Sequence, residues 1–116
     1  MNTLQHFVSG AIWAGASVRT GDIFNPATGA VASKVRMASA ADVDHAVAAA
    51  RSAQPAWGAT PPAKRAAAMF EFRNLLNSHA DELAEMLSAE HGKTIADAKG
   101  ELARGIEVVE FACGIP

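Results

Sequence analysis

The sequence predicts an α/β protein in which short β-hairpin strands are followed by about four α-helices. Two observations carry this prediction. Residues 1–38 alternate short apolar segments with glycine and proline turns, which is typical of strands. Residues 39–116 instead space apolar side chains three and four residues apart, between residues that commonly begin and end helices.

The strand region carries two turn signals. HFVSGAIW has apolar residues on both sides of Ser9-Gly10, which predicts a short hairpin. A polar link, AGASVRTGD, follows. In IFNPATGAVASKV, Pro26 presets one turn dihedral and Gly29 tolerates a positive one, so NPATG predicts a second turn between two apolar segments.

The first predicted helix begins after Ser39, a good N-cap with Asp42 three residues later. We expect it to end before Pro55, because proline lacks an N–H and restricts the residue before it. Thr60 is predicted to cap a second helix that has Pro61 at its first position. The apolar stripes of these two helices are Val43, Ala46, Val47 and Ala50, and then Ala66, Met69, Phe70, Phe72, Leu75 and Leu76.

Two further helices follow. Ser78 is predicted to cap the third, which has Asp81 and Glu82 in its first turn. Gly92 suits the end of that helix, and Thr94 with Asp97 suits the start of the fourth. The stripes are Ala80, Leu83, Ala84 and Leu87 in the third helix, and Ile95, Ala98, Leu102, Ile106, Val109 and Cys113 in the fourth.

The stretch EHGKTIADAKGE contains Gly92-Lys93-Thr94, which looks like the end of a phosphate-binding loop. Such a loop needs another glycine five residues before Gly92, with a strand ahead of it. Leu87 stands at that position, and the segment before Gly92 is predicted to be helical. The stretch therefore indicates a helix end followed by a helix start, and not a nucleotide site.

Composition narrows the class of protein. Of the 116 residues 50% are hydrophobic, but 27 are alanine, so large apolar side chains are few. We therefore expect the stability of the fold to depend on a partner or on the rest of a longer chain. The net charge of −2, with both signs interspersed, argues against a nucleic-acid partner. No apolar run reaches membrane-spanning length, and the start of the chain does not read as a secretory signal. A single cysteine, Cys113, excludes an internal disulfide and favours a cytoplasmic location.

Several motifs together resemble the N-terminal region of the aldehyde dehydrogenase superfamily. They are FNPATGAV, SAADVDHAVAAAR, PAW, PPAKRA and EHGKTIADAKGELARGIEVVEFACGIP. The last is most similar to the methylmalonate-semialdehyde branch, whose members are acylating and coenzyme A-dependent. The resemblance implies that residues 1–116 are the N-terminal part of a longer enzyme, with strands and turns in 1–38 and helices packing on the cofactor domain in 39–116. The apolar ending VVEFACGIP fits a chain that is cut short.

The same resemblance implies an oxidoreductase that uses NAD, with coenzyme A as co-substrate, and that assembles as a dimer or tetramer. Its substrate is a small aldehyde carrying a carboxylate. The family's cofactor-binding segments, general-base glutamate and nucleophilic cysteine lie beyond the stretch that matches this chain. We therefore assign no catalytic, cofactor-binding or metal-ligating residue here, and expect residues 1–116 to be inactive alone.

Arg104 is the candidate substrate ligand. Two residues correspond to about 200° of helical rotation, so Arg104 projects opposite the stripe residues Leu102 and Ile106. Val108 and Phe111 lie on its side of the helix, which predicts a helix with two apolar faces. A planar guanidinium can bind both oxygens of a carboxylate, and the resemblance places a substrate-carboxylate arginine at this position of the motif GE-x-x-RG. Without the resemblance, surface pairing with Glu101 or Glu107 is the favoured interpretation.

The remaining candidates have structural interpretations. Cys113 lies on the apolar stripe with no histidine near it in sequence, so we expect packing and not nucleophilic chemistry. The four histidines have no metal-pair spacing, and surface or capping positions are expected. Two other functions stay open besides the methylmalonate-semialdehyde one: an aldehyde dehydrogenase for a different aldehyde, and a stand-alone helical module that binds a partner.

Overall fold

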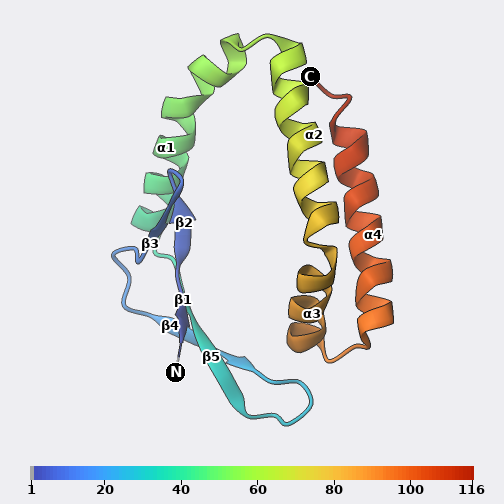
Figure 1. Ribbon diagram of the computed structural model, residues 1–116. Helices are drawn as coiled ribbons and strands as arrows, with labels where there is room; N and C mark the ends of the chain where they lie inside the picture. Colours follow the sequence, from blue (N-terminus) through green and yellow to red (C-terminus); the bar gives the residue numbers. More distant parts are fainter. Residues whose placement is uncertain (1) are drawn as a thin grey trace. The chain divides into compact units, whose positions relative to one another are not determined.

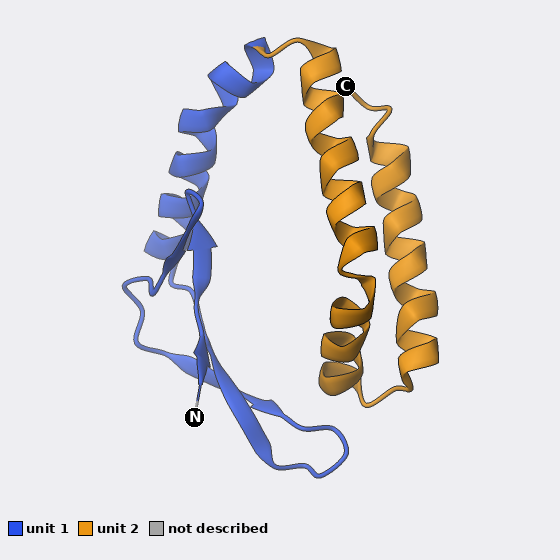
Figure 2. Ribbon diagram, viewed as in Figure 1, with its two compact units in different colours: residues 1–59 blue, residues 60–116 orange. Residues whose placement is uncertain are grey.

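The computed structural model describes residues 2–116, which form two compact units, 1–59 and 60–116 (Figure 2). Among the described residues, the strands and the first helix belong to the first unit, and the three later helices belong to the second. The predicted α/β class, with short strands followed by four helices, is confirmed. None of the helices in the described part of the chain has the length and hydropathy needed to cross a bilayer.

The strands of the first unit form two small sheets (Figure 1). β2 (His6–Val8) and β3 (Ala11–Trp13) are the predicted hairpin, with Phe7 opposite Ile12. Ser9 and Gly10 both have positive φ, as a tight hairpin turn requires, so the Ser9-Gly10 signal is confirmed.

The second sheet has the order β1-β5-β4, with β1 at Thr3–Leu4, β4 at Thr20–Phe24 and β5 at Val31–Arg36. The NPATG turn joins β4 to β5 as predicted, and the Asn25 side chain accepts hydrogen bonds from the amides of Ala27 and Thr28. β4 begins three residues earlier than the apolar segment IF suggested. β1 was not predicted at all, because its two residues pair in parallel with β5, about thirty residues away.

Helix α1 (Ala40–Ala59) begins where Ser39 predicted but does not end before Pro55. That expectation was wrong. Proline at position 55 removes the hydrogen bond to the carbonyl of Arg51 and crowds that carbonyl, but its fixed φ is that of a helix. With most of one turn still to follow, the helix continues to Ala59.

The second unit consists of α2 (Pro62–Ser78), α3 (Ala80–His91) and α4 (Ile95–Ala112), with α4 running back along the other two (Figure 1). The predicted start of α2 was wrong by one residue. Pro61 is the N-cap because Pro62 follows it, and the residue before a proline is driven out of the helical region. The carbonyl of Pro61 accepts the amides of Lys64 and Arg65 at 2.9 and 3.2 Å.

The predicted cap of α3 was also displaced by one residue. α2 extends through Ser78, whose hydroxyl donates to the carbonyl of Leu75 at 3.0 Å. The chain turns at His79 instead, and the carbonyl of His79 accepts the amide of Leu83 at 2.9 Å as the first hydrogen bond of α3. His79 therefore takes the capping position that the sequence assigned to Ser78.

The core of the second unit is built on small residues. Ala84 of α3 and Ala98 of α4 are fully buried, and Cys113 is nearly so. Leu83, Leu87, Leu102, Ile106 and Val109 are half-buried around them, so the predicted stripes of α3 and α4 are confirmed except at Ile95, which is exposed. Among the described residues no large side chain is fully buried, which agrees with the expectation of few large apolar contacts.

Enlarging a buried alanine at the packed helices is expected to destabilise the second unit. Ala98→Leu forces extra volume against α3 and should lower the free energy of unfolding by about 1–3 kcal/mol. Ala96→Leu is the matched control, because Ala96 is exposed on the same turn of α4. Urea denaturation followed by circular dichroism measures both, and equal midpoints for the two variants would contradict the assigned packing.

Candidate functional site

The connection between α3 and α4 is a helix end followed by a helix start. Gly92 has the left-handed φ of 74°, and its amide donates to the carbonyl of Ser88 at 2.8 Å, which ends α3. The Thr94 hydroxyl accepts the amide of Asp97 at 3.2 Å and donates to its carboxylate at 2.9 Å, which begins α4. The predicted interpretation of EHGKT is confirmed, since a helix and not a strand precedes Gly92.

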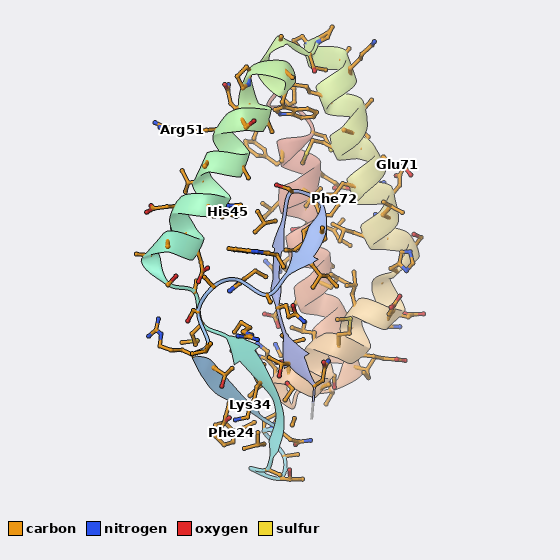
Figure 3. The ribbon with its side chains drawn as sticks, turned by 90° about the vertical axis from the view of Figure 1, so that its left-hand side faces the viewer. Phe24, Lys34, His45, Arg51, Glu71 and Phe72 are labelled. Atoms are coloured by element: carbon orange, nitrogen blue, oxygen red, sulfur yellow. The ribbon has the colours of Figure 1, made fainter. Side chains whose placement is uncertain are left out.

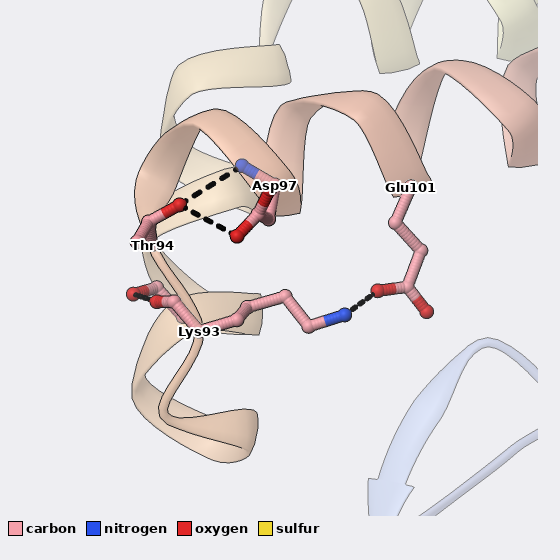
Figure 4. Close-up of polar contacts among 5 residues, drawn as sticks. Lys93, Thr94, Asp97 and Glu101 are labelled. Carbon is pink, nitrogen blue, oxygen red and sulfur yellow. Dashed lines mark hydrogen bonds and ion pairs between the residues drawn. The ribbon is translucent and has the colours of Figure 1, made fainter.

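Lys93 links this connection to the side of α4. Its ammonium group forms an ion pair with the carboxylate of Glu101, two helical turns from the start of α4 (Figure 4). The hydrogen bond and charge of Lys93 lower the pKa of Glu101 below its ordinary value. Glu101 is therefore anionic at neutral pH, and its charge is matched by Lys93 and not by another residue of α4.

Arg104 lies on the exposed side of α4, opposite the packed stripe. Val108 and Phe111 on the same side are 67% and 79% exposed, so the second apolar face predicted for this helix is present and uncovered. Within residues 2–116, no hydrogen bond or ion pair involves the Arg104 side chain, so pairing with Glu101 or Glu107 does not occur. The guanidinium is free to bind an anion.

Two more ion pairs tie α4 to its neighbours. Arg73 of α2 donates through Nε to Glu110 at 2.7 Å, and Lys99 lies 2.6 Å from Asp81 of α3. Both pairs are largely exposed to solvent, so the packing of the half-buried stripe, more than these pairs, sets which side of α4 carries Arg104.

Cys113 and the histidines fall largely as expected. Cys113 is 4% exposed at the end of the packed stripe, which confirms a packing position. His79 and His91 lie at helix ends. In the part of the chain that the structure describes, no group of three potential ligands could hold a metal ion.

The first unit contains a cluster that sequence reasoning missed. The rings of His6 of β2 and His45 of α1 both contact Trp13 of β3 in tilted arrangements, with ring centroids 5.8 and 4.6 Å away (Figure 3 labels His45). These residues come from three elements, so no local spacing could have indicated the cluster. His6 and Trp13, with Phe7 and Val47, also line a cavity of about 440 Å³ beside α1.

Asp42 is the second residue whose role was missed. The sequence marked it as a first-turn acid, and the structure adds that it is buried, at 3% exposure. Its carboxylate accepts the amides of Ala16 at 2.7 Å, Ser17 at 3.3 Å and Ser39 at 2.8 Å, and also the hydroxyl of Ser39 at 2.7 Å. These bonds, led by that from Ala16, hold the pKa of Asp42 far below its ordinary value. Asp42 thus fastens the link after the hairpin to the start of α1.

The hairpin, the small mixed sheet and the helices that follow can be compared with known proteins. The aldehyde dehydrogenase family model matches residues 13–116, so the chain is a member of the aldehyde dehydrogenase family. This establishes the family that the motifs indicated.

Within that family, similar proteins include malonate-semialdehyde and methylmalonate-semialdehyde dehydrogenases. The malonate-semialdehyde dehydrogenase of Pseudomonas aeruginosa is 47% identical over all 116 residues, which span 23% of its length. The crystal structure of methylmalonate-semialdehyde dehydrogenase from Oceanimonas doudoroffii is 46% identical with a TM-score of 0.94, and a Sinorhizobium meliloti 1021 protein complexed with NAD is 55% identical with a TM-score of 0.95. The chain covers 24% of each of these two structures and is itself covered completely.

Proposed function

We propose that this chain is the N-terminal portion of an NAD-dependent, coenzyme A-acylating dehydrogenase for malonate semialdehyde or methylmalonate semialdehyde. The aldehyde, NAD⁺ and coenzyme A would give an acyl-coenzyme A, NADH and carbon dioxide. The observation that carries the proposal is the similarity over the whole chain to dehydrogenases of this kind, together with an unpaired arginine on α4. We infer a cytoplasmic enzyme that works as a dimer or tetramer, with NAD bound outside this chain.

In this function Arg104 would bind the carboxylate of the substrate. Its planar fork can donate two parallel hydrogen bonds to the two oxygens, and lysine cannot reproduce that geometry. Val108 and Phe111 would pack against residues outside this chain, which would exclude water from one side of the guanidinium. A charge-assisted contact gains strength when water is excluded in this way.

The uncovered apolar side chains are consistent with helices that pack on a cofactor domain. Phe111 of α4, Phe70 of α2 and Val47 of α1 are each about half or more exposed in this chain. Fully burying a side chain of this size contributes roughly 1.5–3 kcal/mol. We infer that the rest of the enzyme supplies this burial, and that residues 1–116 alone have no dehydrogenase activity.

A substrate panel on the intact enzyme tests the proposed function. NADH formation, followed by absorbance, should require both coenzyme A and a carboxylated aldehyde, and malonate semialdehyde should exceed propanal in kcat/KM by at least about tenfold, or 1.4 kcal/mol. A matched reaction without coenzyme A is the control. A higher kcat/KM for propanal would favour the alternative, an aldehyde dehydrogenase for a neutral aldehyde.

A further inference from the structure

The backbone around Lys93 is held at three points, so its side chain starts from a fixed position. The Ser88 hydroxyl donates to the carbonyl of Lys93 at 2.6 Å, Gly92 ends α3 and Thr94 caps α4. The Lys93 side chain is 26% exposed and extends along α4 to Glu101 (Figure 4). An ordered lysine of this kind selects one carboxylate, and that carboxylate lies three residues before Arg104.

Glu101 is the acidic side chain best placed to bind Arg104. Residues three apart on a helix are surface neighbours, with Cβ atoms about 5–6 Å apart. Long helical side chains lean toward the N-terminus of their helix, which favours Glu101 over Glu107 as a partner for Arg104. Yet no bond joins Glu101 to Arg104.

We propose that Lys93 is a positioning residue that holds Glu101 away from Arg104 and so leaves the guanidinium free for the carboxylate of the substrate. The proposal rests on the substrate role proposed for Arg104. Lys93 acts in two ways: it draws the Glu101 carboxylate toward the connection before α4, and it offsets a negative charge that would repel an anionic substrate. The same contact lowers the pKa of Glu101, as expected for a carboxylate paired with an ammonium group.

Removing the lysine charge in the intact enzyme tests the proposal. In Lys93→Met, Glu101 is released to bind Arg104, so KM for malonate semialdehyde should rise about fivefold, or roughly 1 kcal/mol, with kcat changed less than twofold. The kinetic constants for propanal should not change, because propanal has no carboxylate. Adding Glu101→Gln to Lys93→Met should restore KM, since no competing carboxylate is left.

Three further variants separate positioning from simple structural support. Lys93→Arg keeps the charge and should keep the wild-type KM, and Lys93→Gln repeats the measurement if the methionine variant does not fold. Glu107→Gln is the matched control. It removes an acid three residues after Arg104, opposite to the direction in which helical side chains lean, so KM should stay as in wild type. An unchanged KM in Lys93→Met, or a raised KM that Glu101→Gln fails to restore, would overturn the role of Lys93.

The same series includes Arg104→Leu. This variant distinguishes an error in the role of Lys93 from an error in the proposed function. If Arg104→Leu selectively impairs the carboxylated aldehyde while Lys93→Met does not, only the role of Lys93 is wrong. If Arg104→Leu leaves the preference for that aldehyde intact, the substrate role of Arg104 is wrong and the role of Lys93 fails with it.

Discussion

Arg104→Leu in the intact enzyme is expected to lower kcat/KM for malonate semialdehyde by roughly 100-fold. A hydrogen bond to a charged group contributes about 1.5–3 kcal/mol, and each 1.4 kcal/mol is a factor of ten. Leucine has no hydrogen-bond donor and no charge, so the carboxylate of the substrate would enter the site without a partner. Steady-state NADH formation with malonate semialdehyde and with propanal measures the effect, and propanal should be affected less than about threefold.

Two controls define what that result means. Arg51→Leu removes an arginine from an exposed position of α1 (labelled in Figure 3) and should leave both substrates unaffected. Arg104→Lys keeps the charge without the planar fork, so an intermediate loss is expected. An equal loss for both aldehydes in Arg104→Leu would mean that the residue supports the fold and does not bind the carboxylate.

Asp42→Asn is expected to loosen the attachment of residues 14–19 to α1. The change keeps the size of the side chain but replaces one of two oxygens that accept hydrogen bonds from Ala16, Ser17 and Ser39. The decrease in the free energy of unfolding should exceed that of Ser39→Ala. Ser39→Ala removes only the N-cap hydroxyl and costs about 1 kcal/mol. Hydrogen exchange of the Ala16 and Ser17 amides, read by mass spectrometry, should become faster in Asp42→Asn.

The stabilisation that Asp42 provides should decrease toward acid pH. Because the native pKa of Asp42 lies below its ordinary value, its stabilising effect is complete above about pH 4 and is lost as the pH falls below that. The difference between wild type and Asp42→Asn should therefore be largest near neutral pH and shrink on acidification. Asp44→Asn, at an exposed position two residues later, is the control and should show no such difference.

Much of the site could be predicted from sequence because its signals are local. The end of α3 at Gly92 and the cap at Thr94 depend on residues within one turn, and both were predicted correctly. The two-sided character of α4 follows from helical periodicity alone, and the exposure of Val108 and Phe111 confirms it. The errors at Pro61 and Ser78 were single-residue displacements, where neighbouring residues competed for the same capping position.

The pairing of charges could not be predicted in the same way. Helical spacing offered Arg104 two acids, Glu101 and Glu107, and the structure uses neither. Lys93 reaches Glu101 from the connection before the helix, so the outcome depends on where a flexible side chain is anchored. Eight residues separate the two partners, which no helical neighbour rule covers.

The sequence alone determined the hairpin, the two turns, the order of the four helices, the packed stripe of α4 and the position of Arg104 on its other face, because each follows from chemistry within a few neighbouring residues. Only the tertiary structure decided that Asp42 is buried under the link after the hairpin, that His6 and His45 contact the Trp13 ring, and that Lys93 binds Glu101. These contacts join elements through space. Their formation depends on which surfaces the backbone brings together, and local propensity carries no information about that.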